Sequence, residues 1–153
     1  MRTFSEAELP ALASELVAEI RGKRGSPFAR VALSGTLGAG KSTLARHILT
    51  AFGIRREAEG SPTFAIAHEY TSGDGVRVIH ADGYRLKSEH ELEATGLLES
   101  LWDPEVVVLF EWLDQFPVTE LALRESPLPT LWLSLGFATN ANERTLEVMK
   151  TGF

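Results

Sequence analysis

The sequence predicts an α/β domain in three layers, α/β/α, with a mixed sheet that is parallel at its centre. Short apolar runs alternate along the chain with segments of helical periodicity, which is the pattern of a sheet covered by helices. Val106 to Phe110 is an unbroken run of five apolar residues, typical of a parallel strand buried on both faces. The length of 153 residues fits one domain, 1–153, which can bury about two-thirds of the surface that the unfolded chain exposes.

The N-terminal third is expected to contain two helices and a strand. The first helix has apolar residues at helical spacing: Leu9, Leu12, Ala13, Leu16 and Ile20. Ser5 to Glu8 has the pattern of a capping box, whereas Pro10 favours a later start because its missing N–H suits only the first turn. A strand is predicted over Arg30 to Ser34. A second helix is predicted over Lys41 to Phe52.

The remaining elements are mostly strands. They are expected at Phe64–Tyr70, Val76–Ile79, Val106–Phe110, Leu131–Phe137 and Arg144–Met149. The first two are joined as a hairpin by a glycine-containing turn. Ser88 to Trp102 is predicted to form one polar helix, or two short ones broken at Gly96. Ser126 to Pro129 is predicted to be a proline-bounded loop.

Composition excludes several classes of protein. The chain has no cysteine, so disulfides, thiolate metal sites and a cysteine nucleophile are excluded. No apolar run approaches the ~18 residues of a membrane span, and Met1 to Pro10 lacks the apolar core of a signal peptide. We therefore expect a cytoplasmic protein. The net charge of −6, without a basic stripe, predicts poor binding to RNA by the chain alone.

A phosphate-binding loop follows the predicted strand at Arg30 to Ser34. The pattern G-x-x-x-x-G-K-[ST] is matched in full by Gly35, Thr36, Leu37, Gly38, Ala39, Gly40, Lys41 and Ser42. Glycines let the backbone approach an anion, and the N–H groups of the loop and of the next helix then point toward it. Lys41 is expected to reach the β- and γ-phosphates, Ser42 to bind Mg²⁺, and Thr43 to contact a phosphate oxygen. This predicts a P-loop NTPase-like fold.

Two acids are candidates for holding Mg²⁺ or positioning water. Glu111 follows the buried run from Val106 to Phe110, where a P-loop protein needs a carboxylate; alternatively it is a solvated charge at a strand end. Asp82 follows the strand at Val76 to Ile79 in the same way, and alternatively caps a turn. One acid would bind the metal and the other orient water, but the sequence does not decide which.

Four further residues lie near these motifs and stay open. Thr63, in Ser61-Pro62-Thr63-Phe64, is either a switch threonine that reaches the γ-phosphate or part of a simple turn. His80 is either a packed histidine or a base. Trp112 is most simply a packing residue. Arg85 would pair with phosphate or with a surface acid.

Together these blocks resemble a known family, the TsaE (YjeE-type) ATPases of bacterial tRNA threonylcarbamoyladenosine biosynthesis. The likeness covers nearly the whole chain, and the four blocks at these spacings are much more specific than the P-loop alone. In chain order the blocks are Gly35-Thr36-Leu37-Gly38-Ala39-Gly40-Lys41-Ser42-Thr43, Ser61-Pro62-Thr63-Phe64, His80-Ala81-Asp82-Gly83-Tyr84-Arg85-Leu86 and Glu111-Trp112.

The resemblance implies a function that composition does not give. The protein would bind ATP with Mg²⁺ and hydrolyse it slowly, acting with TsaD- and TsaB-type subunits that install threonylcarbamoyl on N6 of adenosine 37 of tRNA (t6A37). It would meet tRNA only indirectly, and hydrolysis would reset the complex between turnovers. Lys41, Ser42, Thr63, Asp82 and Glu111 match the functional residues of the family, with Ser42 where threonine is usual. Phe4 and Ser5 would lie near the adenine.

Three other functions remain as alternatives. A small-molecule kinase of the P-loop class would need an arginine-rich lid, but the only lid-sized segment, Leu86 to Trp102, is acidic. A GTPase would need an Asn-Lys-x-Asp segment, and Thr139 to Asn142 is not one. An adaptor that binds nucleotide without hydrolysis would not need the two acids Asp82 and Glu111.

Overall fold

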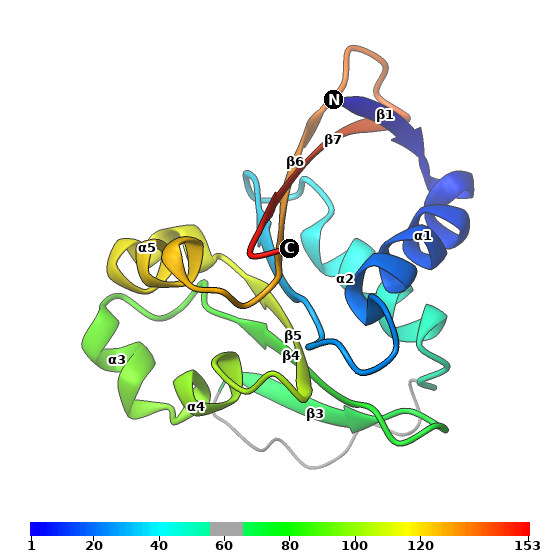
Figure 1. Ribbon diagram of the computed structural model, residues 1–153. Coiled ribbons are helices and arrows are strands. Elements are labelled where there is room, and N and C mark those ends of the chain that lie inside the picture. The colour runs from blue at the N-terminus through cyan, green and yellow to red at the C-terminus, as the bar shows by residue number, and fades with distance from the viewer. Residues whose placement is uncertain (56–65) are drawn as a thin grey trace.

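The computed structural model describes residues 1–55 and 66–153. In this part of the chain, seven strands form one sheet in the order β1-β7-β6-β2-β5-β4-β3 (Figure 1). The strands β6, β2, β5 and β4 are parallel to their neighbours within this group, and β3, β7 and β1 add antiparallel edges. Their bounds are β1 Arg2–Ser5, β2 Arg30–Ser34, β3 Ala67–Thr71, β4 Arg77–Asp82, β5 Val106–Glu111, β6 Thr130–Phe137 and β7 Glu143–Thr151.

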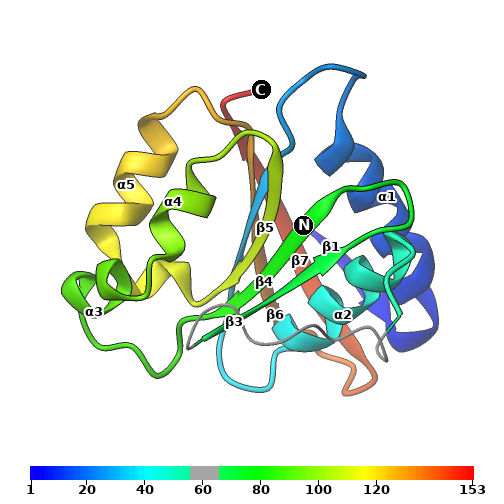
Figure 2. The same cartoon turned by 90° about the horizontal axis from the view of Figure 1, so that it is seen from below.

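Helices cover both faces of the sheet, so the predicted three-layer fold is confirmed (Figures 1 and 2). One apolar core lies under α1 and α2, and a second lies under α3, α4 and α5. The bounds are α1 Leu9–Arg21, α2 Lys41–Ala51, α3 Glu89–Ala94, α4 Leu97–Leu101 and α5 Pro117–Glu125, with short 3₁₀ turns η1 Glu6–Glu8 and η3 Leu113–Gln115. Gly96 separates α3 from α4 with a φ of +79°, so the predicted break is confirmed.

The N-terminus differs from the prediction in one respect. Arg2–Ser5 forms the edge strand β1, which pairs antiparallel with β7. The Ser5 N–H donates to the Glu8 carboxylate at 3.2 Å, so the expected cap forms, but it starts the 3₁₀ turn η1. The α-helix begins at Leu9 and places Pro10 in its first turn, where a missing N–H costs nothing. A four-residue edge strand carries too short a pattern to be read from sequence.

Helix α5 was not predicted. Only Thr119 and Leu123 of its nine residues are buried, whereas Val118 and Leu121 are exposed. At nine residues, the helix is shorter than the window of about 11–18 residues over which helical periodicity is recognised, so its apolar pattern is brief. Pro117 at the first helical position is the one local signal for its start.

The parallel strands bring the sequence blocks to one edge of the sheet. Leu33 of β2 lies opposite Glu111 of β5, and Asp82 of β4 lies opposite Glu111 from the other side. Both β4 and β5 extend further than predicted, so Asp82 and Glu111 are the last residues of their strands. The phosphate loop starts at Gly35, directly after β2. The register thus fixes the loop and both acids at the carboxyl ends of adjacent strands, where ligands bind in such sheets.

Arg30 anchors the opposite end of β2. Its side chain is only 1% exposed. The guanidinium donates to the carbonyl oxygen of Asp103 at 2.8 Å and to that of Val106. Burial lowers the pKa of Arg30 to about 10, with the Asp103 carboxylate acting in the opposite direction. Arg30 therefore stays charged at neutral pH and joins β2 to the segment that enters β5.

Candidate nucleotide site

The phosphate loop is wound tightly around its own glycines. Gly35, Gly38 and Gly40 have φ angles of +137°, +82° and +105°, which side-chain-bearing residues rarely adopt. A Cβ atom on Gly35 would overlap the carbonyl oxygen of Leu135 on β6. Gly40 is the last residue before α2, so the free N–H groups of that helix face the loop. This backbone is a concave set of donors suited to an anion.

Lys41 lies inside the loop and is 5% exposed. Its Nζ donates to the carbonyl oxygens of Gly35 at 2.6 Å and Thr36 at 2.9 Å, and lies 4.0 Å from the centre of the Trp112 ring. Burial lowers the pKa of the ammonium, while the carboxylates of Glu111, Asp114 and Asp82 oppose the change. Since an ammonium has three N–H donors and the loop uses two, one remains for a bound anion.

Glu111 joins three elements of the fold. Ser42 Oγ, from the first turn of α2, donates to Glu111 Oε1 at 2.7 Å. His80 Nε2, from β4, lies 2.6 Å from Glu111 Oε2. Burial alone would raise the pKa of Glu111, which is 2% exposed, but the hydrogen bonds from His80 and Ser42 and the nearby charges of His80 and Lys41 bring it below its ordinary value. Glu111 is therefore ionised at neutral pH.

Asp82 lies at the open side of the same site. Its carboxylate is exposed, and Oδ1 accepts a hydrogen bond from the Tyr84 N–H at 3.0 Å. Asp82 lines a cavity of about 600 Å³ together with Ser42, His80 and Glu111. Within the described residues, Asp82 makes no hydrogen bond to Ser42, so the contacts distinguish Glu111, which is held against the loop, from Asp82, which faces the cavity.

A second hollow of about 500 Å³ lies on the other side of the phosphate loop. Phe4, Ser5, Gly38, Thr43 and Arg144 are among the residues that line it. The loop therefore stands between two hollows, one at the Glu111 side and one at the N-terminal strand. Thr43 faces the second hollow, whereas Ser42 faces the first.

The side chains at the loop fit a magnesium–nucleotide complex. Mg²⁺ prefers oxygen ligands and is usually held by one or two protein groups together with phosphate oxygens and water. The Ser42 hydroxyl and the Glu111 carboxylate supply two such oxygens in contact with each other. Within residues 1–55 and 66–153, no group of three or more acids and histidines could hold a metal by itself. A site completed by phosphate oxygens matches this donor set.

Comparison with known proteins decides the family. The family model described as threonylcarbamoyl adenosine biosynthesis protein TsaE matches residues 3–145. This chain belongs to the TsaE family. The resemblance seen in its sequence blocks is thereby confirmed, and the family name links its members to threonylcarbamoyladenosine biosynthesis.

Several relatives named tRNA threonylcarbamoyladenosine biosynthesis protein TsaE are similar to this chain. The one from Streptomyces coelicolor is 48% identical over 84 residues, 54% of this chain and 55% of the relative. The one from Haemophilus influenzae is 36% identical over 85 residues, 56% of this chain and 52% of the relative. The chain thus spans about half the length of these two. A relative from Aquifex aeolicus is 30% identical over 119 residues, 72% of this chain and 85% of the relative.

A solved structure supports the fold. The crystal structure of YdiB from Bacillus subtilis superposes with a TM-score of 0.64 and 25% sequence identity, over 99% of this chain and 86% of that one.

No helix in residues 1–55 and 66–153 of this TsaE-family chain has the length and apolar character needed to cross a membrane.

The TsaE sequence blocks meet in space as far as the structure describes them. Lys41, Ser42, Asp82 and Glu111 lie together at the ends of β2, β4 and β5. Thr63 lies outside the described residues. His80 and Trp112 were left open or treated as packing, yet His80 contacts Glu111 and Trp112 lies against Lys41. The spacing of His80 two residues before Asp82, which puts both on one face of a strand, was the available signal.

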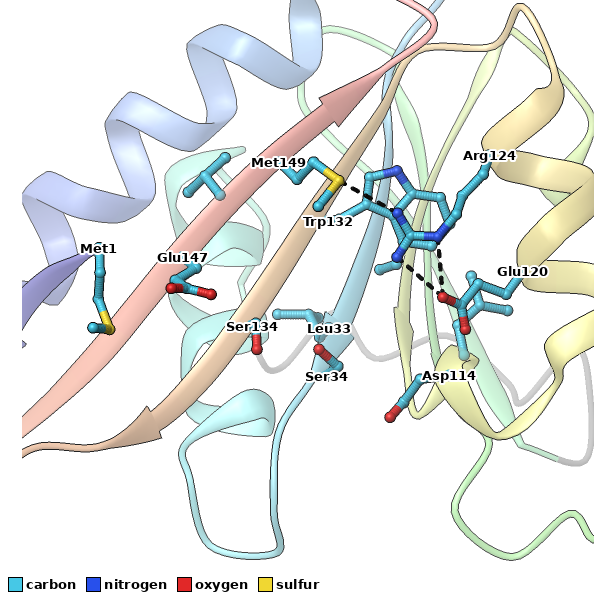
Figure 3. A pocket seen from close by; sticks show the side chains of 13 residues that line it. Met1, Leu33, Ser34, Asp114, Glu120, Arg124, Trp132, Ser134, Glu147 and Met149 are labelled. Atoms are coloured by element: carbon cyan, nitrogen blue, oxygen red, sulfur yellow. Dashed lines mark hydrogen bonds and ion pairs between the residues drawn. The ribbon is translucent and has the colours of Figure 1, made fainter.

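A further hollow of about 480 Å³ lies between α5 and the strands β6 and β7 (Figure 3). Arg124 stacks over the Trp132 ring at 4.0 Å and pairs with Glu120 at 3.0 Å. Figure 3 shows these side chains directed at one another, with Asp114 and Glu147 apart from them. Among the TsaE-block residues that the structure describes, none lines this hollow.

Proposed function

We propose that this chain binds ATP with Mg²⁺ and hydrolyses it slowly, as the ATPase component of tRNA threonylcarbamoyladenosine biosynthesis. The observation that carries the proposal is the contact between Ser42 and Glu111 beside the phosphate loop. A loop that bound phosphate only as a structural part would not need a buried, ionised carboxylate against its hydroxyl. The family name supplies the biological setting.

The residues of the loop would share the work of binding. The N–H groups of the loop and of α2 would bind phosphate oxygens, and Lys41 would add a positive charge there. Ser42 and Glu111 would hold magnesium, which supplies positive charge to the phosphate oxygens when bound. The hollow beside Phe4 and Ser5 is the place for the base, because it adjoins the loop on the side away from Glu111.

The two acids would have different roles in hydrolysis. Glu111 is fixed by hydrogen bonds on both of its oxygens, which suits a metal ligand. Asp82 faces the cavity with an exposed carboxylate, which suits a group that orients a water molecule. We therefore assign the magnesium side to Glu111 and the water side to Asp82. Thr63 keeps its proposed role as a switch threonine.

The partners proposed for the chain come from its family. TsaD- and TsaB-type subunits would form the threonylcarbamoyl-transfer complex, and tRNA would be met through them. Hydrolysis would reset that complex between turnovers in the cytoplasm. The net charge of −6 supports an indirect role toward tRNA, because phosphate backbones repel an acidic chain that lacks a basic stripe.

The segment that a kinase would need as a lid is fixed to the rest of the fold. The segment that could have closed over phosphates forms α3 and α4, and Glu89 of α3 accepts hydrogen bonds from the Val118 and Thr119 N–H groups at the start of α5. Leu92 of the same helix is fully buried. This segment is thus attached to the rest of the fold, which does not suit a lid that opens and closes.

Phosphate release from ATP tests the proposal. Release should be slow for the chain alone, faster with TsaD- and TsaB-type partners, and lower with GTP. In a Lys41→Ala variant, ATP affinity should fall by about 10- to 100-fold, because a charge-assisted hydrogen bond is worth about 1.5–3 kcal/mol. Unchanged ATP affinity in that variant would contradict the nucleotide site, and transfer of phosphate to a small acceptor would establish the kinase.

A further inference from the structure

His80 holds the buried carboxylate of Glu111 from the neighbouring strand. In the parallel register of β4 and β5, His80 lies opposite Leu109, so its side chain shares a face with Glu111 two residues further along. The distance from His80 Nε2 to Glu111 Oε2 is 2.6 Å, and Ser42 Oγ occupies the other oxygen at 2.7 Å. Each carboxylate oxygen thus has a partner from a different element.

The direction of the His80 hydrogen bond follows from the charge of Glu111. An ionised carboxylate has no proton and can only accept, so the proton lies on His80 Nε2 and the imidazole is the donor. Such a bond to a buried charge is stronger than one between neutral groups. Glu111 is almost fully buried, so removal of the His80 hydrogen bond would leave a charged oxygen with one donor fewer, which costs free energy.

A carboxylate on a flexible side chain can present either oxygen to a ligand by turning about its last bond. With Oε2 tied to His80, only Oε1 remains for the phosphate loop, and it already lies against the Ser42 hydroxyl. Asp82 has a different arrangement: its Oδ1 accepts from the Tyr84 backbone N–H at an exposed strand end. The histidine therefore acts on one of the two acids.

We propose that His80 is a positioning residue for Glu111, which fixes Oε1 beside Ser42 for the bound magnesium. The inference rests on the proposed function, because it assumes a magnesium–nucleotide complex at the loop. His80 itself would touch neither nucleotide nor metal. Removal of a residue that orients a metal ligand by a hydrogen bond typically lowers metal affinity by about 10- to 100-fold.

Three variants isolate this role. His80→Leu removes the hydrogen-bond donor and puts an apolar side chain of similar size in its place. His80→Gln places an amide N–H near the position of Nε2 and should restore the contact. His90→Leu is the control, because His90 is exposed on α3 and lines neither of the two hollows beside the phosphate loop.

The measurement is calorimetric binding of a non-hydrolysable ATP analogue with excess MgCl₂ and with EDTA. The ratio of the two affinities reports the magnesium contribution without any turnover. His80→Leu should lower this ratio about tenfold or more and leave the affinity in EDTA within about twofold. His80→Gln should keep most of the ratio, and His90→Leu should match the wild-type chain.

Two results would overturn the inference: an unchanged ratio in His80→Leu, or a loss in His80→Gln as large as in His80→Leu. If His80→Leu does not fold, His80→Asn, whose amide is too short to reach Oε2, takes its place with the same expectation. A wild-type chain that does not bind the analogue would defeat the proposed function itself. If the wild-type chain and His80→Leu bind the analogue with the same dependence on magnesium, only the role of His80 is refuted.

Discussion

Replacement of Arg30 by methionine is expected to destabilise the fold by only about 1 kcal/mol, because two large effects oppose each other. The carbonyl oxygens of Asp103 and Val106 lose their hydrogen bonds from the charged guanidinium, worth about 1.5–3 kcal/mol each, although the Asp103 oxygen keeps the Val106 N–H at 3.3 Å. The opposing effect is that burial of the charged guanidinium raises the free energy of the native state. A pKa lowered from 12.5 to about 10 corresponds to about 3 kcal/mol, which methionine recovers.

Alanine at the same position separates the two effects from packing. Arg30→Ala recovers the charge term as methionine does, but it also leaves a cavity where the side-chain stem was packed, which adds about 2–3 kcal/mol. Urea unfolding followed by circular dichroism measures both variants. For a domain of this size the methionine variant should shift the midpoint by about 0.5 M, and the alanine variant by more than twice that.

Equal loss of stability in the two variants would refute the packing contribution, because the charge and hydrogen-bond effects are the same in both. A loss of about 3 kcal/mol or more in Arg30→Met would refute the cancellation, because the carbonyl hydrogen bonds would then outweigh the recovered cost of burying the charge. ATP affinity is the control. Arg30 is the first residue of β2 and Ser34 is the last, about 13 Å away at ~3.3 Å per residue. The phosphate loop follows Ser34. A folded Arg30→Met variant should therefore bind ATP within about twofold of the wild-type chain.

Two further predictions concern the site. Gly35→Ala should abolish ATP binding in calorimetry while circular dichroism stays α/β, because a Cβ would overlap the Leu135 carbonyl oxygen and φ is +137°; retained binding would show that the loop relaxes freely. Glu111→Gln removes the charge of the proposed magnesium ligand, so it should lower the rate of phosphate release by about 10- to 100-fold and lower the magnesium contribution to ATP affinity at least as much as His80→Leu does; normal turnover would return Glu111 to a structural role.

The parts of the candidate nucleotide site could be predicted from the sequence because they are local. The phosphate loop is continuous from Gly35 to Ser42, and a buried apolar run followed by an acid predicts that Glu111 emerges at the end of a parallel strand. The meeting of Glu111 with Ser42 follows from topology, since β2 and β5 are neighbours in the sheet. The family resemblance then gave the setting, which no residue chemistry alone could supply.

Other parts of the site depend on contacts that the sequence does not encode locally. His80 reaches Glu111 only because β4 and β5 pair in one particular register, and a slip of one residue would turn the imidazole to the other face. Trp112 lies against Lys41 because its backbone takes a φ of +69°, which no propensity predicts for tryptophan. Helix α5 was missed because its nine residues give too short a periodic pattern.

The pairing of β1 with β7 has a kinetic consequence for the site. Arg2 and Leu146 are about 140 positions apart in the chain, so the closure of this edge carries the largest loop entropy of any contact in the sheet. Because closing a longer loop costs more entropy, we expect this edge to form after the parallel centre and the phosphate loop. Phe4 and Ser5 follow on that strand, and they form a wall of the hollow proposed for the base. During refolding, the ability to bind phosphate should therefore return before the ability to distinguish adenine from guanine.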